Sequence, residues 1–246
     1  MNIVTPKRWA DLNEDQLIYV SGLLMSSRTE YEIALYAFIR CSGIDIEKHT
    51  GGKAVVRIGK RYAEMDKELF MQGAGAMQWI TQSLIGFEPL RSLAGGTPCD
   101  SALEGVEFEK YIACENWYQA YLATRSTDYL CELAAELYGC ASDRMRKESP
   151  ERLFTAFLWY GGIKQRLAKE FPHYFRKVQP GTSAGEGMKM REMIFATMRA
   201  LTGGDITKTE SVLKADTWSA LYELDSKAHE TMEMEARINK MKSKRL

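Results

Sequence analysis

The sequence has no excess of either charge. Its 246 residues carry 33 Lys and Arg against 33 Asp and Glu, so the formal net charge is zero. This balance excludes a globally basic nucleic-acid-binding protein and an acidic solvating tail, although it leaves room for a local patch. Hydrophobic residues make up 45% and charged residues 27%, as in ordinary globular proteins. A chain of this length forms one large domain or two small ones with a sizeable core.

Cysteines are few, and their number is odd. They are Cys41, Cys99, Cys114, Cys131 and Cys140, and no two are spaced as CxxC. Small secreted domains that lack a core use dense, even sets of cysteines. We therefore expect reduced thiols in a cytoplasmic setting, most of them buried as small apolar side chains.

Long apolar runs are also missing. The longest lie near 17–25 and 153–163, short of the roughly 20 residues that a membrane-spanning helix requires. No apolar stretch follows Lys7 and Arg8 as it would in a signal peptide. The sequence predicts a soluble protein that does not contact the membrane.

Metal-binding spacings are nearly absent. There are three histidines and no HExxH motif. Glu170 and His173 have the ExxH spacing of carboxylate-bridged di-iron bundles, but that fold needs two such motifs and Pro172 lies inside this one. Asp225 and His229, four residues apart, are predicted to form a surface pair instead. We expect no metal.

Phosphate-binding and nucleophile motifs are equally thin. Gly73-Ala74-Gly75 lacks the third glycine of a dinucleotide fingerprint, and Gly51-Gly52-Lys53 lacks the flanking residues of a P-loop. No GxSxG elbow occurs, and no cysteine has a histidine nearby in sequence. We predict no catalytic residue and no cofactor, and hence a protein that is not an enzyme. An enzyme whose site is assembled from residues far apart in sequence is one alternative, beside the two binding functions described below.

The apolar pattern of the first 85 residues predicts helices around one small hairpin. Asn13 is expected to cap the first helix, and Gly43 to end the second. Residues 44–62 form the best β-hairpin candidate, with its turn at 50–52. Asp66 is expected to start a further helix reaching Leu84, in which the Gly73–Ala76 stretch predicts a close helix crossing or a break.

Residues 86–106 contain Pro89, Gly95, Gly96, Pro98 and Gly105 without a periodic apolar pattern. We interpret them as a loop or linker between residues 1–85 and a helical bundle over residues 107–246. The predicted fold is therefore mainly α (α+β): an N-terminal helical hairpin with a small β-hairpin, followed by a C-terminal helical bundle.

Several start and stop signals organise this bundle. Ser149-Pro150-Glu151 starts a helix that is apolar nearly all round, as in a bundle centre. Residues 179–187 predict a mobile loop, followed by a helix from 188 to 201. Thr207 is expected to cap a short helix and Asp216 the last one.

Two surfaces are candidates for binding. The last helix, 216–246, is the candidate docking element for a partner protein, with candidate contact residues Trp218, Leu221, Tyr222 and Leu224. The methionines at 188, 190, 193 and 198 add a hint of an adaptable apolar surface, although core filling is the commoner explanation of such residues.

The alternative surface is basic. Lys53, Arg57, Lys60 and Arg61 of the hairpin, with the basic C-terminal tail at 237–245, could contact the phosphates of nucleic acid. A solvated strand face and a helix C-terminus with dipole-complementing lysines explain the same residues. If these residues contact phosphates, the protein is a DNA-binding accessory protein.

Several segments resemble proteins encoded in phage-like and prophage tail gene clusters of Bacteroidota. They are LNEDQLIYVSGLL, IALYAFIRCSGI, FEKYIACENWYQAYLATRSTDYLCELAAELY, RLFTAFLWYGGIKQRLAKEFPHYF and ALTGGDITKTESVLKADTWSALYELDSKAHE. The resemblance consists of packing and capping residues and carries over no catalytic residue. It implies a non-enzymatic structural or assembly protein of the tail region, acting in the host cytoplasm or in the virion. The partners would be other phage tail proteins or the chain itself.

Overall fold

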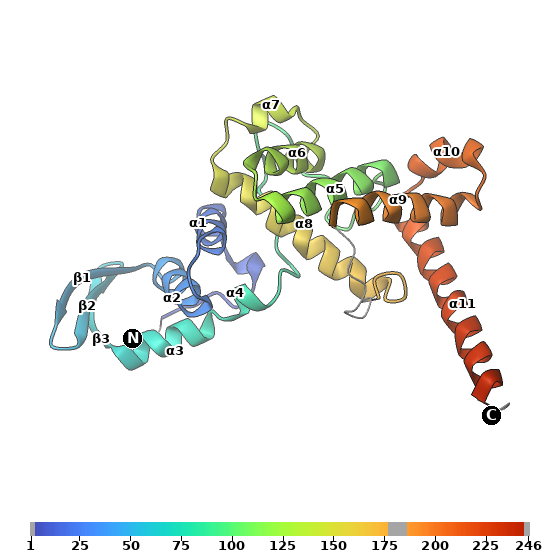
Figure 1. The fold of residues 1–246 in the computed structure, drawn as a ribbon. Helices are drawn as coiled ribbons and strands as arrows, with labels where there is room; N and C mark the ends of the chain where they lie inside the picture. Colours follow the sequence, from blue (N-terminus) through green and yellow to red (C-terminus); the bar gives the residue numbers. More distant parts are fainter. Residues whose placement is uncertain (1–2, 177–185, 244–246) are drawn as a thin grey trace.

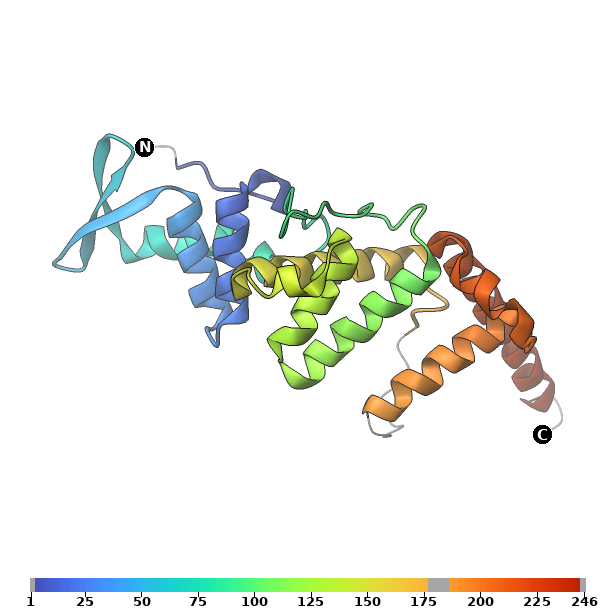
Figure 2. The ribbon, with the colours of Figure 1, turned by 90° about the horizontal axis from the view of Figure 1, so that it is seen from above.

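The computed structural model describes residues 3–176 and 186–243. The chain is mainly helical with one small antiparallel sheet, which confirms the predicted fold class. In Figures 1 and 2 the molecule is elongated, with the sheet at one end and the C-terminal helix projecting from the other.

The N-terminal helices begin and end where the capping signals predict. After a short 3-10 turn, η1 (Trp9–Asp11), come α1 (Glu14–Met25) and α2 (Glu30–Cys41). The backbone amide of Gln16 donates to Asn13 Oδ1 at 2.9 Å, and the Gln16 side chain accepts from the Asn13 amide. This reciprocal capping box fixes the start of α1. Gly43 follows α2 with φ of +65°, a conformation that glycine adopts without steric cost.

The sheet has one strand more than the predicted hairpin. Strands β1 (Ile44–Thr50), β2 (Lys53–Ile58) and β3 (Arg61–Asp66) pair in sequence order. The predicted turn at Gly51-Gly52 joins β1 to β2. The prediction missed β3 because charged residues alternate with its apolar ones, although Met65 is buried and lies opposite Ala54 of β2.

The helix predicted from Asp66 is divided in two. Asp66 caps α3 (Lys67–Ala76), and α4 (Trp79–Gln82) follows a break. A Cβ placed on Gly73 would lie 2.3 Å from the ring of Phe38, so α2 and α3 cross closely there. The Gly73–Ala76 stretch therefore produces both the crossing and, at its end, the break.

Residues 86–106 contain no helix, as predicted, but they and the preceding residues 83–85 are not a free linker. Leu90 and Leu93 are fully buried, and the Tyr138 hydroxyl donates to the Leu90 carbonyl at 3.2 Å. The Leu84 backbone passes over Gly162, where a Cβ would lie 2.4 Å from its carbonyl oxygen. This segment joins the two halves of the chain in one continuous core.

The second half consists of helices around α8. They are α5 (Phe108–Thr124), α6 (Thr127–Tyr138), α7 (Ser142–Met145), α8 (Pro150–Glu170), α9 (Glu186–Thr202), η2 (Ile206–Lys208), α10 (Thr209–Leu213) and α11 (Thr217–Ser243). Ser149 caps α8, and its middle turns are buried from Leu153 to Ile163 between α1 and α6. The predicted central helix is therefore confirmed (Figure 1).

Two details of this half differ from the predictions. Asp205, rather than Thr207, caps the short turn η2, because its carboxylate accepts from both the amide and the hydroxyl of Thr207. Helix α9 begins at Glu186, and the rest of the predicted loop, 179–185, lies outside the described residues. Asp216 caps α11 as predicted, accepting from the Ser219 amide at 3.0 Å.

None of the helices in the described ranges is long and apolar enough to cross a bilayer.

Candidate functional site

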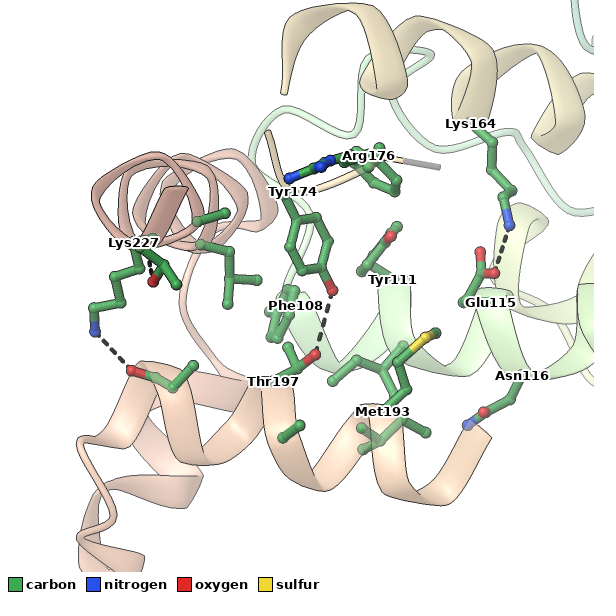
Figure 3. A pocket seen from close by; sticks show the side chains of 18 residues that line it. Phe108, Tyr111, Glu115, Asn116, Lys164, Tyr174, Arg176, Met193, Thr197 and Lys227 are labelled. Atoms are coloured by element: carbon green, nitrogen blue, oxygen red, sulfur yellow. Dashed lines mark hydrogen bonds and ion pairs between the residues drawn. The ribbon is translucent and has the colours of Figure 1, made fainter. Parts of the chain in front are cut away.

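An open cavity of about 640 Å³ lies between α5, α9 and α11 (Figure 3). Residues 174–176 and Lys164 of α8 also line it. The three helices contact one another in pairs, which places them around the cavity. This volume is within the range of about 300–1,000 Å³ that is typical of ligand-binding pockets.

Apolar side chains form most of the cavity wall. Ile112 projects from α5, Met193 and Ile194 from α9, and Leu224 and Ala228 from α11. Met193 is 54% exposed although it lies on this wall. An apolar group entering the cavity would remove this surface from water, which favours binding by about 25 cal/mol per Å² buried.

A half-buried ion pair occupies one end of the cavity. Glu115 of α5 pairs with Lys164 of α8, and its other carboxylate oxygen accepts from the Tyr160 hydroxyl at 3.2 Å. Gln119 donates a further hydrogen bond to Glu115 at 2.8 Å, and the Lys164 ammonium lies over the Tyr118 ring. Both charges are compensated inside the protein, so this end of the cavity is polar but satisfied.

The tyrosines around this ion pair stay protonated at neutral pH. Burial raises the pKa of Tyr111 and Tyr160 well above the usual value, and the negative charge of Glu115 raises it further. Burial also raises the pKa of Tyr174, whose hydroxyl lies 3.3 Å from the Thr197 hydroxyl across the cavity. These shifts move the three tyrosines away from the near-neutral pKa values that general bases have.

The other end of the cavity is bounded by Lys227. Its ammonium donates to the Ala200 carbonyl at 2.6 Å, at the C-terminal end of α9, and pairs with Glu223 at 3.0 Å. A cation at this end of a helix complements the dipole. Lys227 thereby holds α11 against α9 and fixes the distance between two walls of the cavity.

The candidate partner-binding residues of the last helix separate into different environments. Leu224 is buried and lines the cavity, whereas Leu221 is fully buried in the core and is not available to a partner. Trp218 is half-buried, donating from its indole to the Ala102 carbonyl and packing edge-on against Phe171. Tyr222 is 70% exposed beside Trp218 in a second hollow.

The first turns of α11 therefore belong to the core. The expectation that the whole of 216–246 can act as a docking element is corrected, because removing Leu221 and Leu224 would open the core. The part of the helix that is free to dock begins beyond them.

The candidate nucleic-acid residues are largely neutralised. Arg57 pairs with Asp45 and Glu47, each at 2.8 Å, and Lys53 pairs with Glu64 at 3.2 Å. Lys60 and Arg61 are exposed at the turn between β2 and β3. The acids on the neighbouring strands reduce the positive potential that DNA phosphates would meet.

The predicted Asp225–His229 pair is replaced by a different contact. Asp225 accepts from the backbone amides of His173 and Tyr174 at 2.7 and 2.9 Å, and its other oxygen lies 2.9 Å from His173 Nδ1. His229 instead packs its ring edge-on against that of His173, at 4.5 Å between centroids. No local sequence pattern predicts this contact, because 52 positions separate His173 from Asp225. Among the described residues, no group of three His, Cys, Asp or Glu side chains could hold a metal ion.

The cysteines lie outside the cavity wall and are free thiols. Burial raises the pKa of Cys41 to about 11 and also raises the pKa of Cys99, Cys114 and Cys131. A nucleophilic thiol needs the opposite shift, toward a stable thiolate.

Sequence reasoning missed most of the cavity. Glu115 and Lys164 are 49 positions apart, and no motif links them. The one available signal was the group of methionines, of which Met193 lines the wall.

Comparisons with protein-family models, with curated proteins and with solved structures find no match to this chain.

Proposed function

We propose that this protein is a non-enzymatic structural or assembly protein that binds an apolar segment of another protein in the cavity between α5, α9 and α11. The cavity carries the proposal, because it combines an apolar wall with the Glu115–Lys164 pair, whose charges already have partners. An apolar helix or peptide would fill it without leaving Glu115 or Lys164 unpaired. Helix-in-groove recognition works in this way, with apolar anchors spaced along one helix face.

The resemblance to tail-gene-cluster proteins supports a proposal for the partner and for the place of action. The proposed partner is another tail-region protein, and the proposed place of action is the host cytoplasm or the assembled particle. The second candidate, a DNA-binding accessory protein, needs the basic hairpin. It is less favoured because Lys53 and Arg57 already pair with carboxylates. That candidate predicts duplex binding that falls steeply with salt.

The test is affinity capture of the tagged full-length chain from a lysate of its source, with the bound proteins identified by mass spectrometry. Three baits are compared: the wild-type chain, Ala228→Phe and Ala123→Phe. Ala228 lines the cavity, whereas Ala123 is exposed on α5 outside it. The first substitution places a phenyl group inside the cavity, and the second adds the same group to open surface.

We expect a tail tube, sheath or tape-measure protein on the wild-type and Ala123→Phe baits. Its recovery should fall at least about tenfold on Ala228→Phe, which corresponds to about 1.4 kcal/mol. Equal recovery on all three folded baits would place the partner elsewhere and refute the cavity as its site. Recovery of DNA alone would favour the second candidate.

A further inference from the structure

Helix α11 extends far beyond the body of the protein. Its 27 residues span about 40 Å at 1.5 Å per residue. Ala220, Leu221 and Leu224 are buried, but every residue from 233 to 242 is exposed. Figure 1 shows this half of the helix projecting away from the other elements. A helix segment of this length gains most of its stability from packing of an apolar face, and the described part of the chain offers it none here.

The projecting half nevertheless has an apolar face. Met234, Ile238 and Met241 are 64%, 41% and 60% exposed. Their spacing of four and then three residues places them on one side of the helix, in the pattern of a coiled-coil seam. Thr231 continues the same line toward the body. The face is narrow and straight, which fits a second helix better than a globular surface.

Charge is divided along this half of the helix. The acidic residues Glu230, Glu233 and Glu235 come first, and the basic residues Arg237, Lys240 and Lys242 follow. Glu233 and Arg237 form one ion pair within the helix, at 3.6 Å. Two such helices side by side in parallel would place like charges level with each other, which is destabilising. Two antiparallel helices would place each acidic half beside a basic half.

We propose that the projecting half of α11 is a self-association surface, on which a second copy of this chain packs the same helix in the antiparallel direction. A two-fold axis near Ala236 would place Met234 level with Ile238 of the second copy, and Thr231 level with Met241. The same patch then serves both copies, as in other two-fold dimers. Thr231 also lines the cavity, so the inner end of this face adjoins the site of the proposed function, whereas Met234, Ile238 and Met241 lie beyond it.

The first experiment measures the mass of the full-length chain by sedimentation equilibrium at low and high salt. We expect a dimer whose dissociation constant rises with salt, because exposed charges are screened within about 3 Å at 1 M. Ile238→Asp should raise that constant at least about tenfold. The control is Ala236→Asp, which adds the same charge to the opposite face of the helix and should leave dimerisation nearly unchanged.

The second experiment tests the direction of the helices. Thr231→Cys and Met241→Cys chains are mixed under mild oxidation, with the wild-type chain as the control for the native cysteines. Antiparallel pairing predicts a disulfide between the two different variants and little cross-linking of either variant with itself. Preferential self-cross-linking of each variant would overturn the antiparallel arrangement.

Three further results would overturn the proposal: a chain that stays monomeric at low salt, a dimer that survives Ile238→Asp, or a dimer indifferent to salt. The Ala228→Phe chain provides the link to the proposed function. Because its substitution lies in the cavity, it should dimerise like the wild type, so loss of the partner and loss of the dimer are separable.

Discussion

Two glycines of α3 allow a matched test of the packing around Phe38. Gly73 and Gly75 lie two residues apart in one helix, so replacing either with Ala gives a gain in helix propensity of up to about 1 kcal/mol. Their surroundings differ. A Cβ on Gly73 would lie 2.3–2.5 Å from three ring atoms of the buried Phe38, whereas a Cβ on Gly75 would meet nothing within 4 Å.

The ring of Phe38 is 2% exposed and has little room to move. Inserting a methyl group into such a contact costs about 1–3 kcal/mol. The propensity gain largely cancels between the two variants, so Gly73→Ala should be about 1–3 kcal/mol less stable than Gly75→Ala. For a chain of this size that difference lowers the melting temperature by about 2–4 °C per kcal/mol.

Urea unfolding followed by circular dichroism measures both variants against the wild type. We expect Gly75→Ala to be at least as stable as the wild type and Gly73→Ala to be less stable than Gly75→Ala. Equal stability of the two variants, or a more stable Gly73→Ala, would refute the close crossing of α2 and α3 at this point.

Three further predictions concern the second half of the chain. Leu221→Ala should destabilise the fold by about 2–5 kcal/mol in urea unfolding because Leu221 is fully buried, whereas exposed Tyr222→Ala should change it by less than about 0.5 kcal/mol. Burial raises the pKa of Asp225, but hydrogen bonds from His173 and Tyr174 outweigh it, so the pKa in the folded state is lowered. The Asp225 carboxylate therefore contributes to the free energy of unfolding above its unfolded pKa of about 3.9, and this contribution is lost as pH falls through the folded pKa. In a pH series of urea midpoints, Asp225→Asn should reduce the fall in stability at acid pH. Cys114 is buried and its pKa is raised, so it should resist thiol reagents at neutral pH until urea unfolds the chain, as peptide mapping of the labelled sites would show; rapid native labelling would contradict this.

The sequence predicts this fold well where the signals are local. Asn13, Gly43 and Ser149 act within one helical turn, so the limits of α1, α2 and α8 follow from neighbouring residues. Strand β3 was not predicted, because a charged residue separates its apolar residues, Ala63 and Met65. A strand of this kind depends on pairing with β2, which a local pattern does not reveal.

The candidate site depends on contacts between residues far apart in sequence. The Glu115–Lys164 pair and the His173–Asp225 contact join positions about fifty residues apart, and only the packing of α5, α8 and α11 brings them together. The prediction also grouped the buried Leu221 with the exposed Tyr222, although neighbouring positions on a helix point in different directions. The interpretation of 86–106 as a loop or linker could not include the burial of Leu90 and Leu93, because such burial needs no periodic pattern.

We propose that the cavity between α5, α9 and α11 receives a segment of a partner protein. Hydrogen exchange of the full-length chain, alone and with the captured partner, measures whether this cavity is where the partner binds. We expect binding to slow amide exchange in Met193–Ala200 of α9 and in Leu224–Thr231 of α11, while the exchange of β1–β3 stays unchanged. Protection confined to the sheet, with α9 and α11 unaffected, would contradict it.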